Sequence, residues 1–237
     1  MPKGRASLNR SAAELRVAGL TRLSTCDWPG ELAAVLFCQG CGWNCGYCHN
    51  PDLRPAKSNT TLSWTDVFEF LKSRVGLLDA VVFSGGEATL QSSLPQAMKE
   101  TKALGFRIGL HTAGMAPAML ETVLPLVDWV GFDAKAPWAL YKNITGIENS
   151  GSLARQSLEL LLHSGVAYEV RTTVHSALLS RQDLFLLREE LLEMGVKHYV
   201  IQRYRETGVR KELLPAPSEE LQLPDEFGAG FTSFHLR

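Results

Sequence analysis

Three closely spaced cysteines constrain this chain more than any other feature of its sequence. Cys41, Cys45 and Cys48 lie four and three residues apart in the glycine-rich stretch FCQGCGWNCGYCHNP. Three thiolates can hold three corners of a cubic iron-sulfur cluster, and the fourth iron is then without a protein ligand and open to another molecule. The spacing therefore predicts a metal cluster with one open iron.

Three other interpretations of these cysteines have to be weighed. The spacing would also place the side chains on one face of a helix, but Gly40, Gly42 and Gly46 would each cost that helix about 1 kcal/mol relative to alanine. A four-thiolate zinc site with Cys38 stays open, although structural zinc sites usually separate their cysteine pairs by about 15 to 20 residues. A ferredoxin-type carrier with Cys26 as fourth ligand is disfavoured, because the chain is long for a bare carrier.

Composition limits the class of protein. The chain has 237 residues, of which 45% are hydrophobic and 21% charged, so we expect one globular core. With a formal net charge of −1, neither nucleic acid nor a membrane surface is expected as a partner. We find no signal peptide and no apolar run of membrane-spanning length, and the odd number of cysteines, five, suits metal ligation in a reducing compartment; both predict a cytoplasmic protein.

Apolar, β-branched runs alternate with amphipathic stretches along the chain, which is typical of strand-helix units around a parallel sheet. Six strands are predicted, at 32–38, 79–85, 106–112, 128–134, 168–174 and 198–204. Helices are predicted between them, at 63–75, 94–104, 116–126, 152–165 and 181–195. Since a full barrel has eight units in about 250 residues, six units predict an α/β fold that is an incomplete, laterally open (β/α)6 TIM-like barrel with parallel strands.

The predicted units also divide the chain. Residues 1–18 are expected to form an N-terminal extension, 19–205 the partial barrel and 206–237 a C-terminal tail. A short strand around the stretch GLTRLST is expected to flank the first unit.

Residues with chemical potential cluster at the predicted carboxyl ends of the strands. Ligands gather at this edge of parallel strand-helix folds, because the loops and helix N-termini converge there. In addition to the cysteine loop, the edge carries Ser84, Gly85, Gly86, Glu87, His111, Thr112, Asp133, Lys135, Arg171, Gln202 and Arg203. One rim is therefore predicted to hold the site.

The stretches FCQGCGWNCGYCHNPDL and FSGGEATLQ together resemble the radical S-adenosylmethionine (SAM) superfamily. The resemblance implies a [4Fe-4S] cluster held by the three cysteines, with SAM chelated at the open iron. It also implies adenine contacts from the backbone around Gly46 and Tyr47, and methionine contacts from Gly85, Gly86 and Glu87. The resemblance further implies SAM contacts from Asp133 and Lys135, and by their place on the rim Thr112, Arg171 and Gln202 are also expected to bind SAM.

Between about Gly19 and about Arg205, several stretches of the sequence are similar to the anaerobic ribonucleoside-triphosphate reductase activating proteins. This branch also resembles pyruvate formate-lyase activating enzyme. This resemblance implies reductive cleavage of SAM to a 5′-deoxyadenosyl radical, which makes a glycyl radical on the reductase. A flavodoxin- or ferredoxin-type donor would supply the electron. Alternatives are another glycyl-radical partner, a small-molecule enzyme resembling 7-carboxy-7-deazaguanine synthase, or a non-enzymatic iron-sulfur or zinc protein.

Two positions depart from the family pattern. Ala88 stands where relatives typically have the proline of Gly-Gly-Glu-Pro, and His111 replaces the acid of Asp-Thr-Asn-Gly. In the pyruvate formate-lyase branch that acid helps to bind a monovalent cation beside SAM, so the resemblance does not carry a cation site over to this chain. Asp133 and Lys135 keep the acid and the lysine of the family's Asp-x-Lys.

Overall fold

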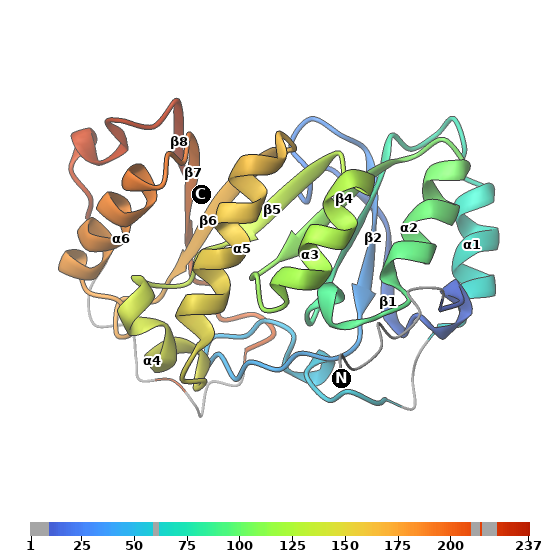
Figure 1. The fold of residues 1–237 in the computed structure, drawn as a ribbon, viewed down its shortest axis with the longest axis horizontal. Helices are drawn as coiled ribbons and strands as arrows, with labels where there is room; N and C mark the ends of the chain where they lie inside the picture. Colours follow the sequence, from blue (N-terminus) through green and yellow to red (C-terminus); the bar gives the residue numbers. More distant parts are fainter. Residues whose placement is uncertain (1–9, 59–61, 210–213, 215–221) are drawn as a thin grey trace, which may run out of the picture.

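The structure is a computed structural model that describes residues 10–58, 62–209, 214 and 222–237. Its described strands form one eight-stranded sheet in chain order: β1 Val17–Ser24, β2 Ala33–Cys38, β3 Ala80–Gly85, β4 Arg107–Thr112, β5 Trp129–Asp133, β6 Ala167–Val174, β7 His198–Arg203 and β8 Ser233–Leu236. The α-helices are α1 Trp64–Lys72, α2 Leu94–Ala103, α3 Pro117–Val123, α4 Tyr141–Thr145, α5 Ser150–Ser164 and α6 Arg181–Glu193. Figure 1 shows the helices together on one side of the curved sheet.

The predicted fold class is confirmed. Strands β2 to β7 pair in parallel and correspond to the six predicted strands, and β1 pairs with β2 in antiparallel fashion. Within the described residues, β1 and β8 stand at opposite ends of the strand order and are not hydrogen-bonded neighbours. The barrel is therefore laterally open between its first and last strands.

The sheet extends beyond the end predicted from the sequence. The segment expected to be a tail contributes β8, which pairs in parallel with β7. The last residue of the chain, Arg237, accepts a backbone hydrogen bond from Arg203 and forms a bidentate ion pair with Glu169 on β6 at 3.0 and 2.8 Å. Four residues with only two apolar side chains do not give a recognisable strand pattern, which explains why the prediction missed β8.

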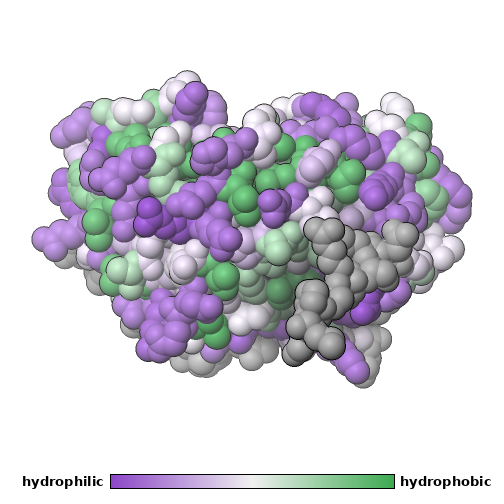
Figure 2. Space-filling model, viewed as in Figure 1, coloured by the Kyte–Doolittle hydropathy of each residue, from purple (hydrophilic) through white to green (hydrophobic). Residues whose placement is uncertain are grey.

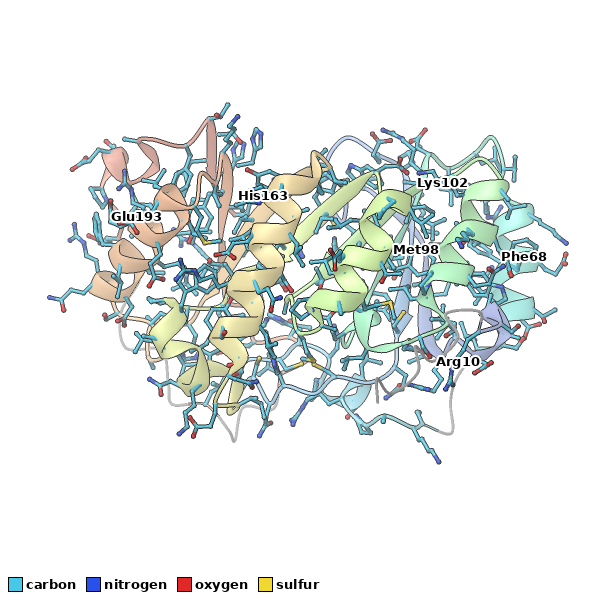
Figure 3. All side chains as sticks on the ribbon, in the orientation of Figure 1. Arg10, Phe68, Met98, Lys102, His163 and Glu193 are labelled. Carbon is cyan, nitrogen blue, oxygen red and sulfur yellow. The ribbon has the colours of Figure 1, made fainter. Side chains whose placement is uncertain are left out.

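The helices begin and end close to the predicted residues. Ser63 caps α1 by accepting a hydrogen bond from the backbone of Asp66, and Gly165 ends α5 with a positive φ of 74°. Met98 on α2 is fully buried against the sheet, whereas Lys102 one turn later reaches the surface (Figure 3). The main core thus lies between the helices and the sheet.

A second, smaller core closes the amino-terminal end of the barrel. Trp28, from the loop between β1 and β2, stacks on Trp129 of β5 with ring centroids 5.4 Å apart. At position 109 a Cβ atom would come within 2.9 Å of the Trp28 ring, so Gly109 is needed to make room. With this end filled, a ligand can reach the barrel interior from the carboxyl ends of the strands or through the lateral opening.

The outer surface is mostly polar. Figure 2 shows hydrophilic side chains over most of the helical face, with smaller hydrophobic patches between them. No helix in the described ranges is both long and apolar enough to cross a membrane.

Candidate active site

A cavity of about 180 Å³ lies at the carboxyl ends of the strands. Its lining brings together most of the predicted site residues: Cys41, Cys45, Tyr47, Cys48, Gly85, Gly86, Glu87, Thr112, Asp133, Lys135 and Arg171. Gly46 and Gln202 are not among the lining residues. Ser84 and His111, also placed on the predicted rim, line the cavity, whereas Arg203 does not; Trp43, His49, Asn50, Ala113 and Thr173 complete the lining. Thr173 could have been predicted, because it follows Arg171 by two residues and so shares its face of β6.

Gln39 clamps the two ends of the cysteine loop together. Its buried side-chain amide donates to the carbonyl of Asp52 at 3.1 Å and to that of Pro55 at 2.7 Å. The adjacent Gly40 donates its backbone N–H to the carbonyl of Leu53 at 2.7 Å. The three cysteines therefore project from a loop whose ends are fixed to each other.

Arg54 and α4 fix the middle of the loop. The Nε atom of Arg54 donates to the carbonyl of Trp43 at 3.1 Å, and the backbone N–H of Asn44 donates to the carbonyl of Thr145 in α4 at 2.8 Å. The rings of Trp43 and Tyr141 meet edge to face with centroids 5.9 Å apart. These contacts hold the loop over the cavity without using the cysteine side chains.

Three of the five cysteines line the cavity, and the other two cysteines lie elsewhere. Cys38 is buried in β2 and Cys26 is exposed beyond β1, and neither lines the cavity. Burial raises the pKa of Cys41 to about 11 and also raises the pKa of Cys45. These thiols are therefore neutral in the metal-free chain, and metal binding has to displace their protons.

Gly85 and Gly86 are required where the loop after β3 meets the cysteine loop. A Cβ atom at position 85 would lie 2.3 Å from the backbone nitrogen of Cys38, and one at position 86 would lie 2.4 Å from the carbonyl oxygen of Gly40. In the structure both glycines make room for the backbone of β2 and of the cysteine loop.

The Glu87 side chain ties the β3 loop to the end of β4. Its carboxylate accepts hydrogen bonds from the backbone and hydroxyl of Thr89, the hydroxyl of Thr112 and the backbone of Ala113, at 2.7 to 3.3 Å. Burial raises the pKa of Glu87, and these hydrogen bonds oppose that rise. Three of these donors bond Oε1 and only Ala113 bonds Oε2, so Oε2 keeps room to accept from a ligand amine.

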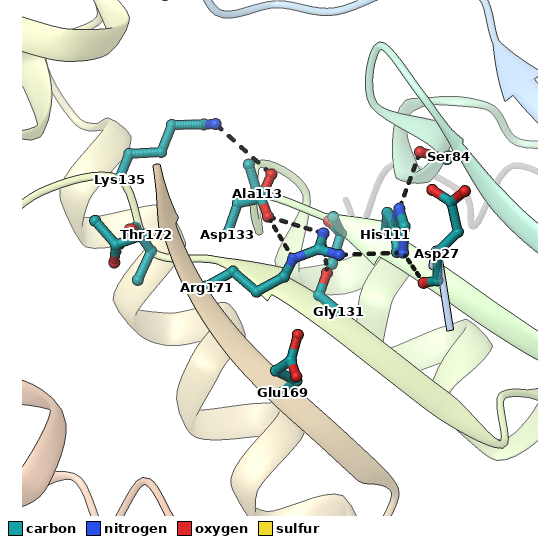
Figure 4. Close-up of polar contacts among 12 residues, drawn as sticks. Asp27, Ser84, His111, Ala113, Gly131, Asp133, Lys135, Glu169, Arg171 and Thr172 are labelled. Carbon is teal, nitrogen blue, oxygen red and sulfur yellow. Dashed lines mark hydrogen bonds and ion pairs between the residues drawn. The ribbon is translucent and has the colours of Figure 1, made fainter. Parts of the chain in front are cut away.

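Charged side chains from β5 and β6 form one side of the cavity (Figure 4). Arg171 donates from Nε and Nη2 to Oδ1 of Asp133, at 3.0 and 2.9 Å, and Lys135 Nζ lies 3.9 Å from the other carboxylate oxygen. Burial alone would raise the pKa of Asp133, but the cations Arg171 and Lys135 hold it below its ordinary value. Asp133 is therefore a carboxylate at neutral pH, and it fixes both cations.

His111 joins this network to the loop between β1 and β2. Its Nε2 atom lies 2.7 Å from the carbonyl of Asp27 and 3.2 Å from Nη1 of Arg171, and its Nδ1 lies 3.2 Å from the hydroxyl of Ser84 (Figure 4). Burial and the Arg171 charge lower the pKa of His111 to about 4. The shortest contact assigns the proton of the neutral ring to Nε2, which donates to Asp27, while Nδ1 accepts from Ser84.

We expect His111 to make stability depend on pH. An unfolded histidine has a pKa of about 6.5, so acidification protonates the unfolded chain before the folded one and favours unfolding. Between about pH 7 and pH 5, the wild type should lose about 2 kcal/mol more unfolding free energy than His111→Gln. Urea unfolding of both proteins at the two pH values measures this difference. Equal losses would contradict a neutral His111.

The residues around the cavity fit a [4Fe-4S] cluster with SAM. The three thiols are the donors that iron-sulfur clusters take, and Lys135 offers a fixed cation for the SAM carboxylate. Tyr47 is packed beneath Lys135, whose Nζ lies 5.6 Å from its ring centroid. Among the described side chains, the Tyr47 hydroxyl is buried with no hydrogen-bond partner, as expected of a group next to a site that a bound ligand completes.

Comparison with known proteins identifies the family. The profile of the radical SAM superfamily matches residues 35–179. A Methanocaldococcus jannaschii protein, provisionally named a glycyl-radical enzyme activating enzyme, is 28% identical over 86% of this chain and 87% of its own length. The pyruvate formate-lyase-activating enzyme of Streptococcus mutans is 31% identical over 84% of this chain and 81% of its own.

Solved structures show the same fold. QueE from Escherichia coli superposes with a TM-score of 0.54 at 17% identity, covering 81% of this chain and 85% of its own. Streptococcus suis SuiB bound to S-adenosylmethionine gives 0.57 at 14% identity over 73% of this chain, which spans 41% of SuiB. The cofactors of the radical SAM superfamily are a [4Fe-4S] cluster and SAM. The chain belongs to the radical SAM superfamily, in its branch of enzymes that activate glycyl-radical enzymes.

Proposed function

We propose that this chain generates the glycyl radical of an anaerobic ribonucleoside-triphosphate reductase. The observation that carries the proposal is the lateral opening between β1 and β8, since a protein loop has to bring its glycine to the cofactor. The resemblance of residues 19–205 to activating proteins of this reductase supports the choice of partner.

The chain's own residues would position the cofactors. When bound, the cluster and SAM supply a carbon-centred radical after uptake of one electron from a flavodoxin- or ferredoxin-type donor. Cys41, Cys45 and Cys48 would hold the iron, and Lys135 would bind the SAM carboxylate. Asp133 lies 3.9 Å from Lys135 Nζ and holds it in place, so its part is to orient the binding group. No side chain needs to act as an acid or a base.

A second candidate partner is pyruvate formate-lyase. The Streptococcus mutans enzyme, 31% identical to this chain, is named for activating that lyase. Both partners would use the same cofactor site, and they would differ in the loop presented to it. We also propose action in the cytoplasm, since the five cysteines are free thiols and three of them line the site.

Activation assays under anaerobic conditions test the partner. The reconstituted protein is incubated with SAM and a one-electron reductant, together with either the reductase or pyruvate formate-lyase. We expect a glycine-centred electron paramagnetic resonance signal with the reductase and a much weaker one with the lyase. A signal from the lyase alone would overturn the proposed partner and leave the family assignment intact.

A further inference from the structure

A second cavity of about 300 Å³ lies beside the active-site cavity. It is formed by β1 and β2, the end of the cysteine loop and the segment after β7, and its lining comprises Ala18, Gly19, Phe37, His49, Asn50, Pro51, Asp52, Leu53 and Gly208. Because β1 is the first strand of the open sheet, this cavity lies on the side of the lateral opening.

The two cavities are neighbours. His49 and Asn50, which directly follow the cluster cysteine Cys48, line both of them. A molecule in the second cavity would therefore lie next to the cofactors without occupying their place.

The described lining of the second cavity suits a polypeptide backbone. It contains no lysine or arginine, so it offers no fixed cation to a phosphate or to the SAM carboxylate. The side-chain amide of Asn50 is a hydrogen-bonding group of the kind that pairs with peptide N–H and C=O groups. The volume is at the small end of the range for ligand pockets, about 300 to 1,000 Å³, which suits the tip of a loop.

Gly19 is the residue that points to a close approach. Glycine inside a strand costs stability, and it often marks a place where another backbone or a ligand comes near. The fold does not require glycine here, because a Cβ atom would meet nothing closer than the Phe37 ring at 3.8 Å and its φ is not positive. The irregular pairing between Val17 and Gly19 explains a bend in β1 and does not itself demand glycine.

The segment after β7 contributes Gly208 to the lining and is tied to His49. The carbonyl of Arg205 lies 3.1 Å from Nε2 of His49, and Gly208 packs so closely that a Cβ atom there would lie 2.6 Å from the His49 carbonyl oxygen. The cavity therefore has a backbone-lined wall attached to the end of the cysteine loop.

We propose that this second cavity receives the backbone of the partner's glycine-bearing loop and so directs the glycine to the active-site cavity. The inference rests on the proposed function, because it takes the partner to be a glycyl-radical enzyme. It adds the route by which the loop arrives and the residue, Gly19, that keeps the route open.

Filling the cavity from Gly19 tests the inference. The full-length chain, reconstituted with its cluster, is compared as wild type, Gly19→Ala, Gly19→Leu and Thr21→Leu. Thr21 is the matched control, because it faces the same side of β1 but does not line the cavity. Iron content, thermal unfolding and SAM affinity are measured for each, followed by the yield of glycyl radical on the anaerobic ribonucleoside-triphosphate reductase.

We expect Gly19→Leu to lower the radical yield by about tenfold or more, the factor that corresponds to an overpacking penalty of about 1.4 kcal/mol. Gly19→Ala should have a smaller effect, and Thr21→Leu should stay within about twofold of wild type. A wild-type yield from Gly19→Leu overturns the inference. If Gly19→Leu loses SAM affinity by the same factor as radical yield, the inference is also overturned, because the second cavity would then bind SAM and not the partner's loop.

Two further outcomes are also decisive. If Gly19→Leu fails to retain iron, Gly19→Ala decides: a yield below half that of wild type supports the inference, and an unchanged yield overturns it. If the wild type itself produces no radical on the reductase, the proposed function fails, and this failure is distinct from equal yields among variants of an active enzyme.

Discussion

Replacing Cys41, Cys45 or Cys48 singly with alanine is expected to abolish reductive cleavage of SAM. Each variant removes one of three thiols that line the active-site cavity, and two thiolates cannot hold a cubic cluster with a single open iron. We expect iron to fall from about four atoms per chain to well below that value, and cleavage to fall by a factor of about 10³ or more. Anaerobic iron analysis and quantification of 5′-deoxyadenosine measure the two effects.

The other two cysteines supply the control. Cys26→Ser and Cys38→Ala should keep the cluster, because Cys26 is exposed beyond β1 and Cys38 is buried in β2, away from the cavity. Cys38→Ala should cost some stability through the small cavity that it leaves. Retained SAM cleavage in any of the three ligand variants, or its loss in Cys26→Ser, would contradict the assignment.

Gly86→Ala is expected to have the second largest effect. The new methyl group would lie 2.4 Å from the Gly40 carbonyl oxygen and 3.0 Å from that of Leu53. The cysteine loop has little freedom to yield, because Gly40 and Leu53 are hydrogen-bonded to each other and Gln39 clamps the loop ends. We expect a loss of about 1–3 kcal/mol in stability and a fall of at least about tenfold in SAM cleavage, since the cysteines are displaced.

Gly105→Ala is the control that separates the loss of stability from the loss of SAM cleavage expected for Gly86→Ala. Gly105 has a φ of 95°, and a Cβ atom there would meet nothing within 4 Å, so alanine costs about 1–2 kcal/mol through backbone strain alone. Its stability should fall about as much as that of Gly86→Ala, while its rate of SAM cleavage stays at the wild-type value. If both variants cleave SAM equally well, the contact between the two loops is not what positions the cysteines.

The fold could be predicted from the sequence where burial dictates the pattern. Strands such as β3 and β5 are covered on both faces, so they are continuous apolar runs with few alternatives. Strand β8 could not be predicted, because it is held by its pairing with β7 and by the ion pair between Arg237 and Glu169. Such long-range contacts leave no periodic signal in the local sequence.

The site could be predicted as a set of positions more readily than as a set of roles. Parallel topology brings the strand ends together, so Asp133, Lys135 and Arg171 were expected to meet. The functions of Glu87 and His111 depend on neighbours that only the folded chain reveals. Glu87 ties the β3 loop to the end of β4 through Thr112 and Ala113, and His111 connects the charged network to the Asp27 carbonyl.

The stacked pair of Trp28 and Trp129 also governs the order in which this chain can fold during synthesis. The first hairpin leaves the ribosome with an indole whose stacking partner, Trp129, is not available until β5 has been translated. Trp28 and Trp129 are far apart in the sequence, so the small core at the amino-terminal end of the barrel is completed late. This delay slows folding and leaves an apolar surface that chaperones can bind in the meantime. Since the two rings meet only when β5 joins the sheet, the fluorescence of a variant that keeps Trp28 and Trp129 and replaces the other three tryptophans would report that step.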